Sequence, residues 1–304
     1  MYAYKKKIIF IGIGLVLLIG LGSRLTHKAD VGLKDKKFNA HWNDGNAEVS
    51  SYELTQNRYG ALRQGDAVLI YVTEDFSKSK HVKLDWPDED KNDAIKVLKL
   101  NSTKEFRTGI YPYHLMTSVF TEVEKAKTLK TSHSVQEWCG HTFSQLNREK
   151  NGYRVRGFSY FQSEGDTDEA LPEALLEDEI WTLLRLHPNS IPLGRQNIIE
   201  SGLIHRLHHK KPGMTSCTIS KADTLWEARS VARLTLDMDE RKLVIYSEKD
   251  FPFTIYGWEE SYAEHGGKVL TSKAKLKRQF RIPYWKLNAP TDSGWRDSLS
   301  LQYR

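Results

Sequence analysis

The chain has 304 residues, of which 39% are hydrophobic, 28% charged and 11% aromatic. This balance excludes collagen, a low-complexity chain and a protein with several membrane spans, and it allows a sizeable core. With 45 basic against 39 acidic residues the net charge is +6, and two cysteines exclude a disulfide scaffold and a four-cysteine zinc module.

The N-terminal segment joins basic residues to a short apolar run. Lys5, Lys6 and Lys7 precede an unbroken apolar stretch over residues 8–22. A helix of this length covers roughly 22 Å, whereas a bilayer core is about 30 Å thick. Residues 1–25 are therefore predicted to be a signal peptide, with an uncleaved signal anchor as the alternative. Either one predicts an extracytoplasmic body, in the periplasm or anchored in the inner membrane and facing it.

Most of the excess positive charge belongs to this leader. Residues 1–22 hold three lysines and no acid, so without them 42 basic residues face 39 acidic ones and the net charge is +3. This small excess does not favour a nucleic-acid partner. Membrane or envelope components, including a lipid or a glycan, are the expected partners.

The body begins with a linker and continues as strands. Residues 26–37 are polar without an apolar period and predict a linker, followed by a single β-rich domain over 38–304. Asp44-Gly45 is typical of a two-residue hairpin turn, and residues 67–73 form a β-branched run that predicts a buried strand.

Alternating residues across Asn151-Gly152 predict a hairpin over 141–162. The same pattern predicts strands near residues 95–106, 109–123, 127–138, 231–237, 242–247, 254–263 and 268–282. Pro172, the acids after it and an apolar stripe predict a helix over 172–187, and a second helix is expected around 197–207. The predicted fold is mainly β (α+β): one large curved antiparallel sheet, half-barrel in form, with one or two helices packed on it.

A histidine cluster and the two cysteines are candidate chemical groups. On a helix His205 and His209 lie one turn apart and could share a metal, although a solvated basic turn explains them as well. Cys139, two residues before His141, fits a buried thiol, a thiol nucleophile, or a disulfide to Cys217 in an oxidising compartment.

The segment 270–282 alternates basic and apolar residues. Lys273, Lys275, Lys277 and Arg281 are predicted on one face, and Tyr284 and Trp285 follow. Such a basic ribbon beside aromatic residues could bind anionic head groups, glycans or a partner protein. The alternative is an edge strand whose lysines prevent aggregation.

Three stretches carry a resemblance: residues 41–54 (HWNDGNAEVSSYEL), 134–141 (SVQEWCGH) and 158–166 (FSYFQSEGD). They resemble an uncharacterised family of Bacteroidota envelope proteins, many of them lipoproteins, and the likeness covers most of the body. This chain lacks the leader cysteine of the lipoprotein members. Residues 242–258 also look like part of the curved half-barrels of lipoprotein-carrier-like folds.

Members of that family have been carried under the name septum formation inhibitor Maf. True Maf proteins are cytosolic nucleotide pyrophosphatases with a Ser/Arg-rich motif near the N-terminus, and no Ser-x-Arg-Arg sequence occurs here. Maf-type hydrolysis is therefore the least favoured function. The first hypothesis is a non-enzymatic envelope protein that binds a lipid, lipoprotein, glycan or partner protein, without a cofactor. It predicts a concave apolar surface on the sheet. The alternative is an extracytoplasmic hydrolase whose cleft contains His205, His209 or Asp166.

Overall fold

A computed structural model of the chain describes residues 35–264 and 267–301. The predictions for the leader and for the linker up to residue 34 lie outside this range. No helix in the described part of the chain is long and apolar enough to cross a membrane.

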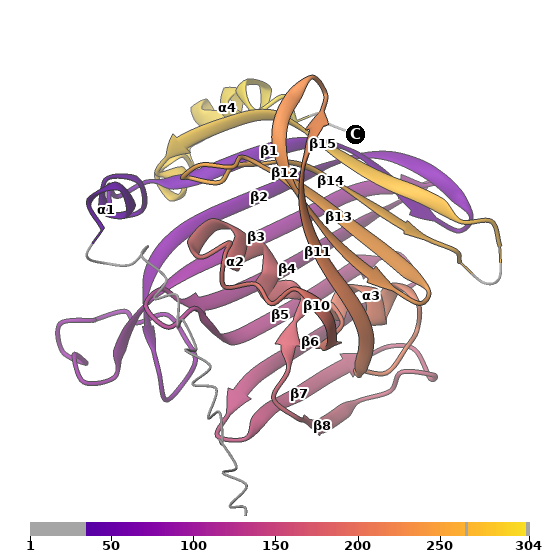
Figure 1. Ribbon diagram of the computed structural model, residues 1–304, viewed down its shortest axis with the longest axis horizontal. Coiled ribbons are helices and arrows are strands. Elements are labelled where there is room, and N and C mark those ends of the chain that lie inside the picture. Colours follow the sequence, from indigo (N-terminus) through magenta and orange to yellow (C-terminus); the bar gives the residue numbers. More distant parts are fainter. Residues whose placement is uncertain (1–34, 265–266, 302–304) are drawn as a thin grey trace, which may run out of the picture.

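The described residues form one mainly antiparallel sheet of fifteen strands, which confirms the predicted fold class (Figure 1). In chain order the strands are β1 (Ala47–Arg58), β2 (Ala61–Ser77), β3 (Ala94–Thr108), β4 (Tyr111–Glu122), β5 (Lys127–Glu137), β6 (Gly140–Glu149), β7 (Gly152–Ser159), β8 (Thr167–Leu171), β9 (Leu175–Leu176), β10 (Gly194–Ile199), β11 (Met214–Trp226), β12 (Arg229–Met238), β13 (Arg241–Ser247), β14 (Ile255–Tyr262) and β15 (Leu270–Ile282). The helices are α1 (Lys36–Trp42), α2 (Glu177–Leu186), α3 (Gly202–Leu207) and α4 (Gly294–Ser298), with 3₁₀ turns η1 (Tyr284–Lys286) and η2 (Pro290–Ser293).

The sheet consists of two runs of sequential strands that meet in its middle. Strands β1 to β8 are neighbours in chain order, and so are β10 to β15. The first and last strands, β1 and β15, pair antiparallel and join the two runs. The short strand β9 pairs parallel with β10, so β8 and β9 form the two edges of the sheet.

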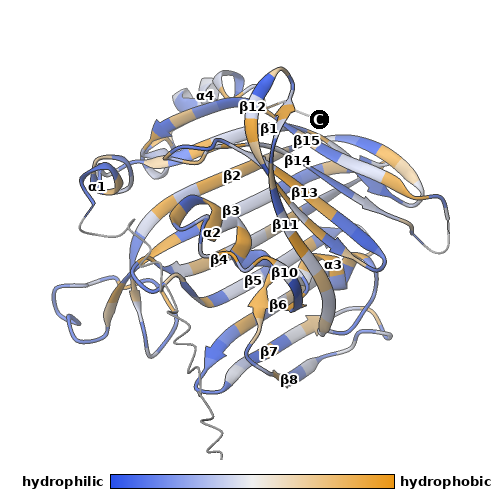
Figure 2. Ribbon diagram, in the orientation of Figure 1, coloured by the Kyte–Doolittle hydropathy of each residue, from blue (hydrophilic) through white to orange (hydrophobic). Residues whose placement is uncertain are grey.

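Helices α2 and α3 lie against the inner, concave face of the sheet (Figure 1). Hydrophobic and hydrophilic residues alternate along the strands, as Figure 2 shows, because successive side chains point to opposite faces. Inner-face residues such as Leu69, Leu100 and Ile245 join Ile180 and Leu183 of α2 in the main core. Each such buried side chain stabilises the fold by about 1.5–3 kcal/mol.

The prediction of an open apolar binding surface on the concave face of the sheet is therefore wrong. The helices cover the inner face, and several charged residues are buried with them. The ligand-binding hypothesis consequently needs a different surface.

Three local predictions also differ from the structure. The linker predicted up to residue 37 ends earlier, because residues 36–42 form α1. Asp35 caps the first turn of α1 by accepting from the backbone N–H of Lys37 at 2.6 Å. Asp44-Gly45 therefore joins a helix to β1 instead of two strands, with Gly45 at φ 79°. The residues around Pro172 lie between two edge strands, so α2 begins at Glu177.

Residues 194–199, at the start of the expected second helix, pair with β11 as β10, and α3 begins only at Gly202. The predicted strands and the hairpin over 141–162 are confirmed.

Strand β15 is an interior strand and not a protected edge. It pairs with β1 on one side and β14 on the other. A bulge lies opposite Ser51 and Tyr52, because Ser51 pairs with Arg278 whereas Tyr52 pairs with Leu276. The extra residue reverses the alternation, so Arg281 and Lys275 lie on opposite faces of the sheet.

Candidate functional site

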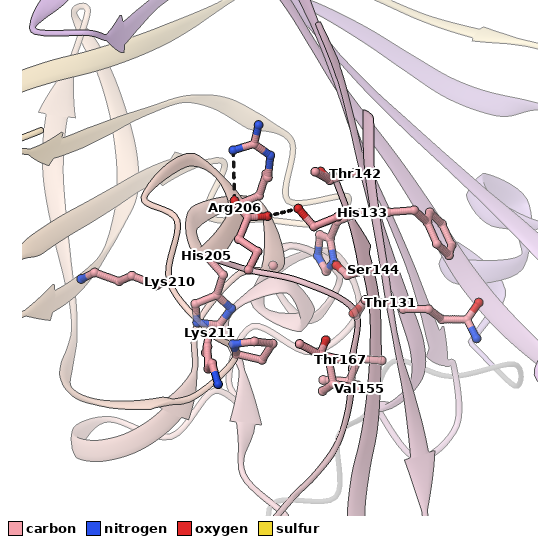
Figure 3. Close-up of a pocket in the computed structure, with 18 of the residues that line it drawn as sticks. Thr131, His133, Thr142, Ser144, Val155, Thr167, His205, Arg206, Lys210 and Lys211 are labelled. Atoms are coloured by element: carbon pink, nitrogen blue, oxygen red, sulfur yellow. Dashed lines mark hydrogen bonds and ion pairs between the residues drawn. The ribbon is translucent and has the colours of Figure 1, made fainter. Parts of the chain in front are cut away.

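Two cavities lie on opposite sides of the sheet. The inner cavity lies between the inner face of β5–β8 and the segment that contains α3, and its volume is about 80 Å³ (Figure 3). The outer cavity lies between the outer face of the sheet and the C-terminal segment 284–301, and its volume is about 560 Å³. Of these two, the outer cavity falls in the size range of about 300–1,000 Å³ that is usual for ligand sites, as does a more polar cavity of about 460 Å³ beside His208 and Arg241.

Three polar residues of the inner cavity form a hydrogen-bonded chain. His133 on β5 and Ser144 on β6 are directly opposite each other in the strand register. Ser144 Oγ lies 3.4 Å from His133 Nδ1, and Nε2 of the same ring lies 2.8 Å from Asp178 Oδ2 at the start of α2. The order hydroxyl, imidazole, carboxylate is that of an activated nucleophile with its base and orienting acid.

Asp178 is held as a carboxylate. Burial alone would raise its pKa, but His133, the Ser201 side chain and the Gly202 backbone N–H outweigh burial and lower the pKa below its usual value. An ionised Asp178 accepts from His133 Nε2–H, so the neutral ring that keeps this hydrogen bond presents Nδ1 to Ser144 as an acceptor.

His205 enters the same cavity from α3 (Figure 3). Burial, followed by the neighbouring His133, lowers its pKa to about 4, so the imidazole is neutral at pH 7. Its Nε2 lies 3.8 Å from Glu200 Oε2. His205 therefore supplies a neutral polar group to a cavity whose walls also include Val155, Leu176 and Ile199.

Cationic and acidic side chains both line the inner cavity, the acids being Glu164, Asp178 and Glu200. Arg206, Lys210 and Lys211 contribute to its lining. Arg206 stacks over Phe161 and pairs with Glu164 at 3.4 Å, and Lys210 pairs with Glu240 at 2.5 Å. Lys211 is exposed at the rim.

A buried ion-pair network next to the inner cavity holds the start of α2 against the sheet. Arg241 on β13 bonds to Glu177 of α2 and to Glu260 of β14, with 2.8 Å between Arg241 Nη1 and each Oε1. Burial raises the pKa of Glu177 although Arg241 opposes this, whereas Lys104 and Arg241 lower the pKa of Glu260 against its burial. These contacts attach the first turn of α2, and with it Asp178, to the sheet.

The outer cavity is mainly apolar. Strands β1, β2 and β15 contribute Val49, Val68, Ile70 and Ile282, and the C-terminal segment contributes Tyr284, Leu287, Trp295, Leu299 and Leu301. Asp66, Glu105, Asp292 and Arg296 also line it. The C-terminal segment is tied to the sheet, because the Ser51 hydroxyl donates to Leu299 O at 2.5 Å and Lys277 Nζ donates to Ser300 O.

The two histidines predicted as metal ligands have different partners. His205 lies beside Glu200, whereas His209 Nδ1 contacts Glu164 Oε1 at 2.7 Å and its ring packs edge-on against Phe161. No group of three or more His, Cys, Asp or Glu side chains that could hold a metal ion occurs among residues 35–264 and 267–301. This geometry does not support a shared metal at the pair.

The two cysteines are free thiols, so the predicted disulfide between them is not formed in the structure. Cys139 is exposed at the turn between β5 and β6 and Cys217 is buried on β11. Burial raises the pKa of Cys217 to about 11, and the Glu137 carboxylate raises that of Cys139. Both shifts favour the unreactive thiol form and oppose a nucleophilic role.

The four basic residues of β15 all have acidic partners. Lys273 pairs with Glu259, Lys275 with Glu227 and Lys277 with Asp66, at 2.7–2.8 Å. Arg281, on the opposite face, bonds to Asp44 and to the carbonyl of His41. They do not form the continuous basic face that the alternation predicts. Of the two aromatic candidates, Tyr284 lines the outer cavity and Trp285 is 44% exposed beside it.

Sequence reasoning missed His133, Ser144 and Asp178. The available signal was slight: Thr131, His133 and Val135 share one face of a strand, which places a histidine on a buried face. In the sequence Asp178 is one of several acids after Pro172, and its place near the positive end of the predicted helix explains it without any catalytic role.

No family model matches this chain, and no curated protein matches it either. Among solved structures it is similar to the crystal structure of a beta-barrel-like protein of domain of unknown function DUF1849 from Brucella abortus. The identity is 7% and the TM-score 0.48, and the alignment covers 78% of this chain and 98% of that chain. A similarity of this size supports no statement about function, and the envelope-family resemblance stays a prediction.

Proposed function

We propose that this protein binds the acyl chain of a lipid in the outer cavity, and that it acts in the cell envelope without catalysing a reaction at this site. The observation that carries the proposal is the lining of that cavity. Eleven apolar or aromatic side chains from the sheet and the C-terminal segment line about 560 Å³. Burial of an acyl chain there is favourable by about 0.8 kcal/mol for each CH₂ group.

The charges around the cavity indicate which lipids fit. Asp66, Glu105 and Asp292 line it together with one arginine, Arg296. Lys277 is paired with Asp66, Glu105 lies 3.8 Å from His114 Nδ1, and Asp292 accepts from the backbone N–H of Ala289 at 2.9 Å, so the acids outnumber the arginine in the lining. This balance disfavours the carboxylate of a free fatty acid and favours a neutral or zwitterionic head group, as in a monoacylglycerol or a phosphatidylethanolamine.

The envelope location rests on the N-terminal sequence alone. A basic segment followed by a short apolar run directs a chain to export, and the envelope supplies the lipids that the outer cavity would take. The intact mass of protein extracted from its own cells tests this point. Loss of about 22 residues, from the 8–22 apolar run and its flank, indicates a cleaved signal, whereas a full-length chain in the membrane fraction indicates an anchor.

Native mass spectrometry with 1-monooleoylglycerol and with oleate tests the ligand. We expect one monooleoylglycerol for each chain and at least tenfold weaker binding of oleate. Val68→Phe fills the outer cavity and should weaken binding of monooleoylglycerol at least tenfold. Val82→Phe makes the same change at a side chain that is 43% exposed and not part of the cavity lining, and should leave binding unchanged. Absence of binding, or equal binding by both variants, would refute the proposal.

A further inference from the structure

We propose that Ser144, His133 and Asp178 form a catalytic centre that hydrolyses short-chain carboxylic esters in the inner cavity. This site is on the opposite side of the sheet from the outer cavity and does not depend on lipid binding there. The proposal rests on three side chains from three different elements that meet in one cavity.

The geometry assigns a role to each group. Ser144 Oγ is the nucleophile and is 3.4 Å from His133 Nδ1, a separation within the looser range of enzymes without substrate. His133 is the general base, and its other ring nitrogen lies 2.8 Å from Asp178. Asp178 is a positioning residue, because it acts through the imidazole and fixes its tautomer.

A glycine lies beside the nucleophile, where the Thr167 hydroxyl leaves no space for a side chain. The residue opposite Ser144 on β7 is Gly157, and a Cβ at Gly157 would come within 2.7 Å of Thr167 Oγ1 and 3.8 Å of Ser144 Cβ. Figure 3 shows His133 and Ser144 side by side on the sheet, with His205 on the facing segment. The small volume of about 80 Å³ and the apolar walls suit an acetyl or similarly short acyl group.

Acylation proceeds by attack of Ser144 Oγ on the ester carbonyl carbon while its proton moves to His133 Nδ1. The C–O bond of the ester then breaks, and the same proton passes to the leaving alkoxide to give the alcohol. Arg206 and Lys210 are paired with Glu164 and Glu240. Lys211, exposed at the rim of the cavity, is the cation assigned to the negative charge that develops on the carbonyl oxygen.

Deacylation uses water as the second substrate. His133 Nδ1 removes a proton from water as its oxygen adds to the acyl carbon, and the proton returns to Ser144 as the acid leaves. The sum is ester and water giving carboxylic acid and alcohol, with no oxidant or reductant.

The test uses the purified full chain with two probes, p-nitrophenyl acetate and a fluorophosphonate. We expect hydrolysis above the buffer rate and a phosphonate adduct that peptide mass spectrometry places on Ser144. Ser144→Ala and His133→Gln should lower the rate at least about 100-fold. Ser134→Ala, on the opposite face of β5, is the matched control and should keep the full rate.

Asp178→Asn separates positioning from a merely structural role. Its rate should fall, and the remaining reaction should shift to alkaline pH, because the wrong imidazole tautomer leaves hydroxide as the base. Near-UV circular dichroism identifies variants that fail to fold. Ser144→Ala removes only one half-buried oxygen, so we expect this variant to fold. A folded Ser144→Ala protein with the wild-type rate overturns the proposal, and so does a wild-type protein without a phosphonate adduct at Ser144. Neither result bears on lipid binding to the outer cavity.

Discussion

Arg185 of α2 and Glu48 of β1 form a bidentate ion pair that is almost completely buried. Arg185 Nη1 donates to Glu48 Oε1 at 2.5 Å and Nη2 donates to Oε2 at 2.8 Å, and each side chain is 1% exposed. The residues are 137 positions apart, so the pair fixes the end of α2 against the middle of the sheet. Arg185 also donates to Pro252 O at 2.9 Å.

Removal of the arginine should be strongly destabilising. Arg185→Met leaves the Glu48 carboxylate buried without its cation, and we expect a loss of about 3–5 kcal/mol in the free energy of unfolding. Urea denaturation measures it. Glu48→Gln together with Arg185→Met should recover part of the loss, because no buried charge then remains. Arg195→Met, at an exposed arginine on β10, should change stability by less than about 0.5 kcal/mol. Similar losses of stability in Arg185→Met and Arg195→Met would contradict the stabilising role of the Arg185–Glu48 pair.

Acid should destabilise the protein in two steps. The pKa of His205 is lowered to about 4 from an ordinary value of 6.5, so the unfolded chain binds its proton first as the pH falls. Stability therefore decreases from pH 6.5 to 4, by roughly 3 kcal/mol for this group. Burial tends to raise the pKa of Glu48, but Arg185 and His41 lower it to about 2, so its contribution is present above pH 4.5 and lost toward pH 2.

His205→Gln isolates the first step. Between pH 4 and 7 the urea midpoint of the variant should fall less steeply with decreasing pH than that of the wild type. Some slope should remain, because burial also lowers the pKa of His187 and His208. An unchanged slope would mean that His205 is not buried as a neutral group.

Gly202 should be required for the position of His133. A Cβ at residue 202 would come within 2.3 Å of His133 Nδ1, so Gly202→Ala must displace the imidazole from Asp178 or move α3. We expect a loss of about 1–3 kcal/mol in stability. The matched control is Gly213→Ala, where the nearest contact is 3.9 Å away. Thermal unfolding and the ¹⁵N chemical shifts of His133 measure both effects, and equal behaviour of the two variants would contradict the packing described here.

The two thiols should differ in accessibility. Cys139 is exposed and Cys217 is buried with a pKa of about 11. Iodoacetamide at pH 8 should modify Cys139 in the native protein and both cysteines in urea, without a reductant. Peptide mass spectrometry counts the labels. Failure to label either cysteine in urea until a reductant is added would instead establish the disulfide that an oxidising compartment allows.

Strand positions could be predicted from the sequence because their signals are local. Alternation and Asn151-Gly152 predict β6 and β7 with little error, since a turn and a two-residue period need no distant partner. Residues 172–176 show the limit of this reasoning. Their composition suits a helix start, but parallel pairing of Leu175 and Leu176 with Ile198 and Ile199 holds them extended.

For the candidate sites, composition indicated aromatic and basic residues near the C-terminus, and of these Tyr284 does line the outer cavity. The basic face failed because a single bulge reverses the alternation along β15, and the bulge arises from pairing with β1, more than 200 residues away in the chain.

The sequence by itself determined the mainly β fold class and most strand positions, because each depends on residues close together in the chain. The tertiary structure alone decided that β1 and β15 meet, that helices with several buried charged residues cover the concave face, and that Ser144, His133 and Asp178 converge. These depend on which distant segments pair and which side chains then lose contact with water, and neither is written in a local pattern.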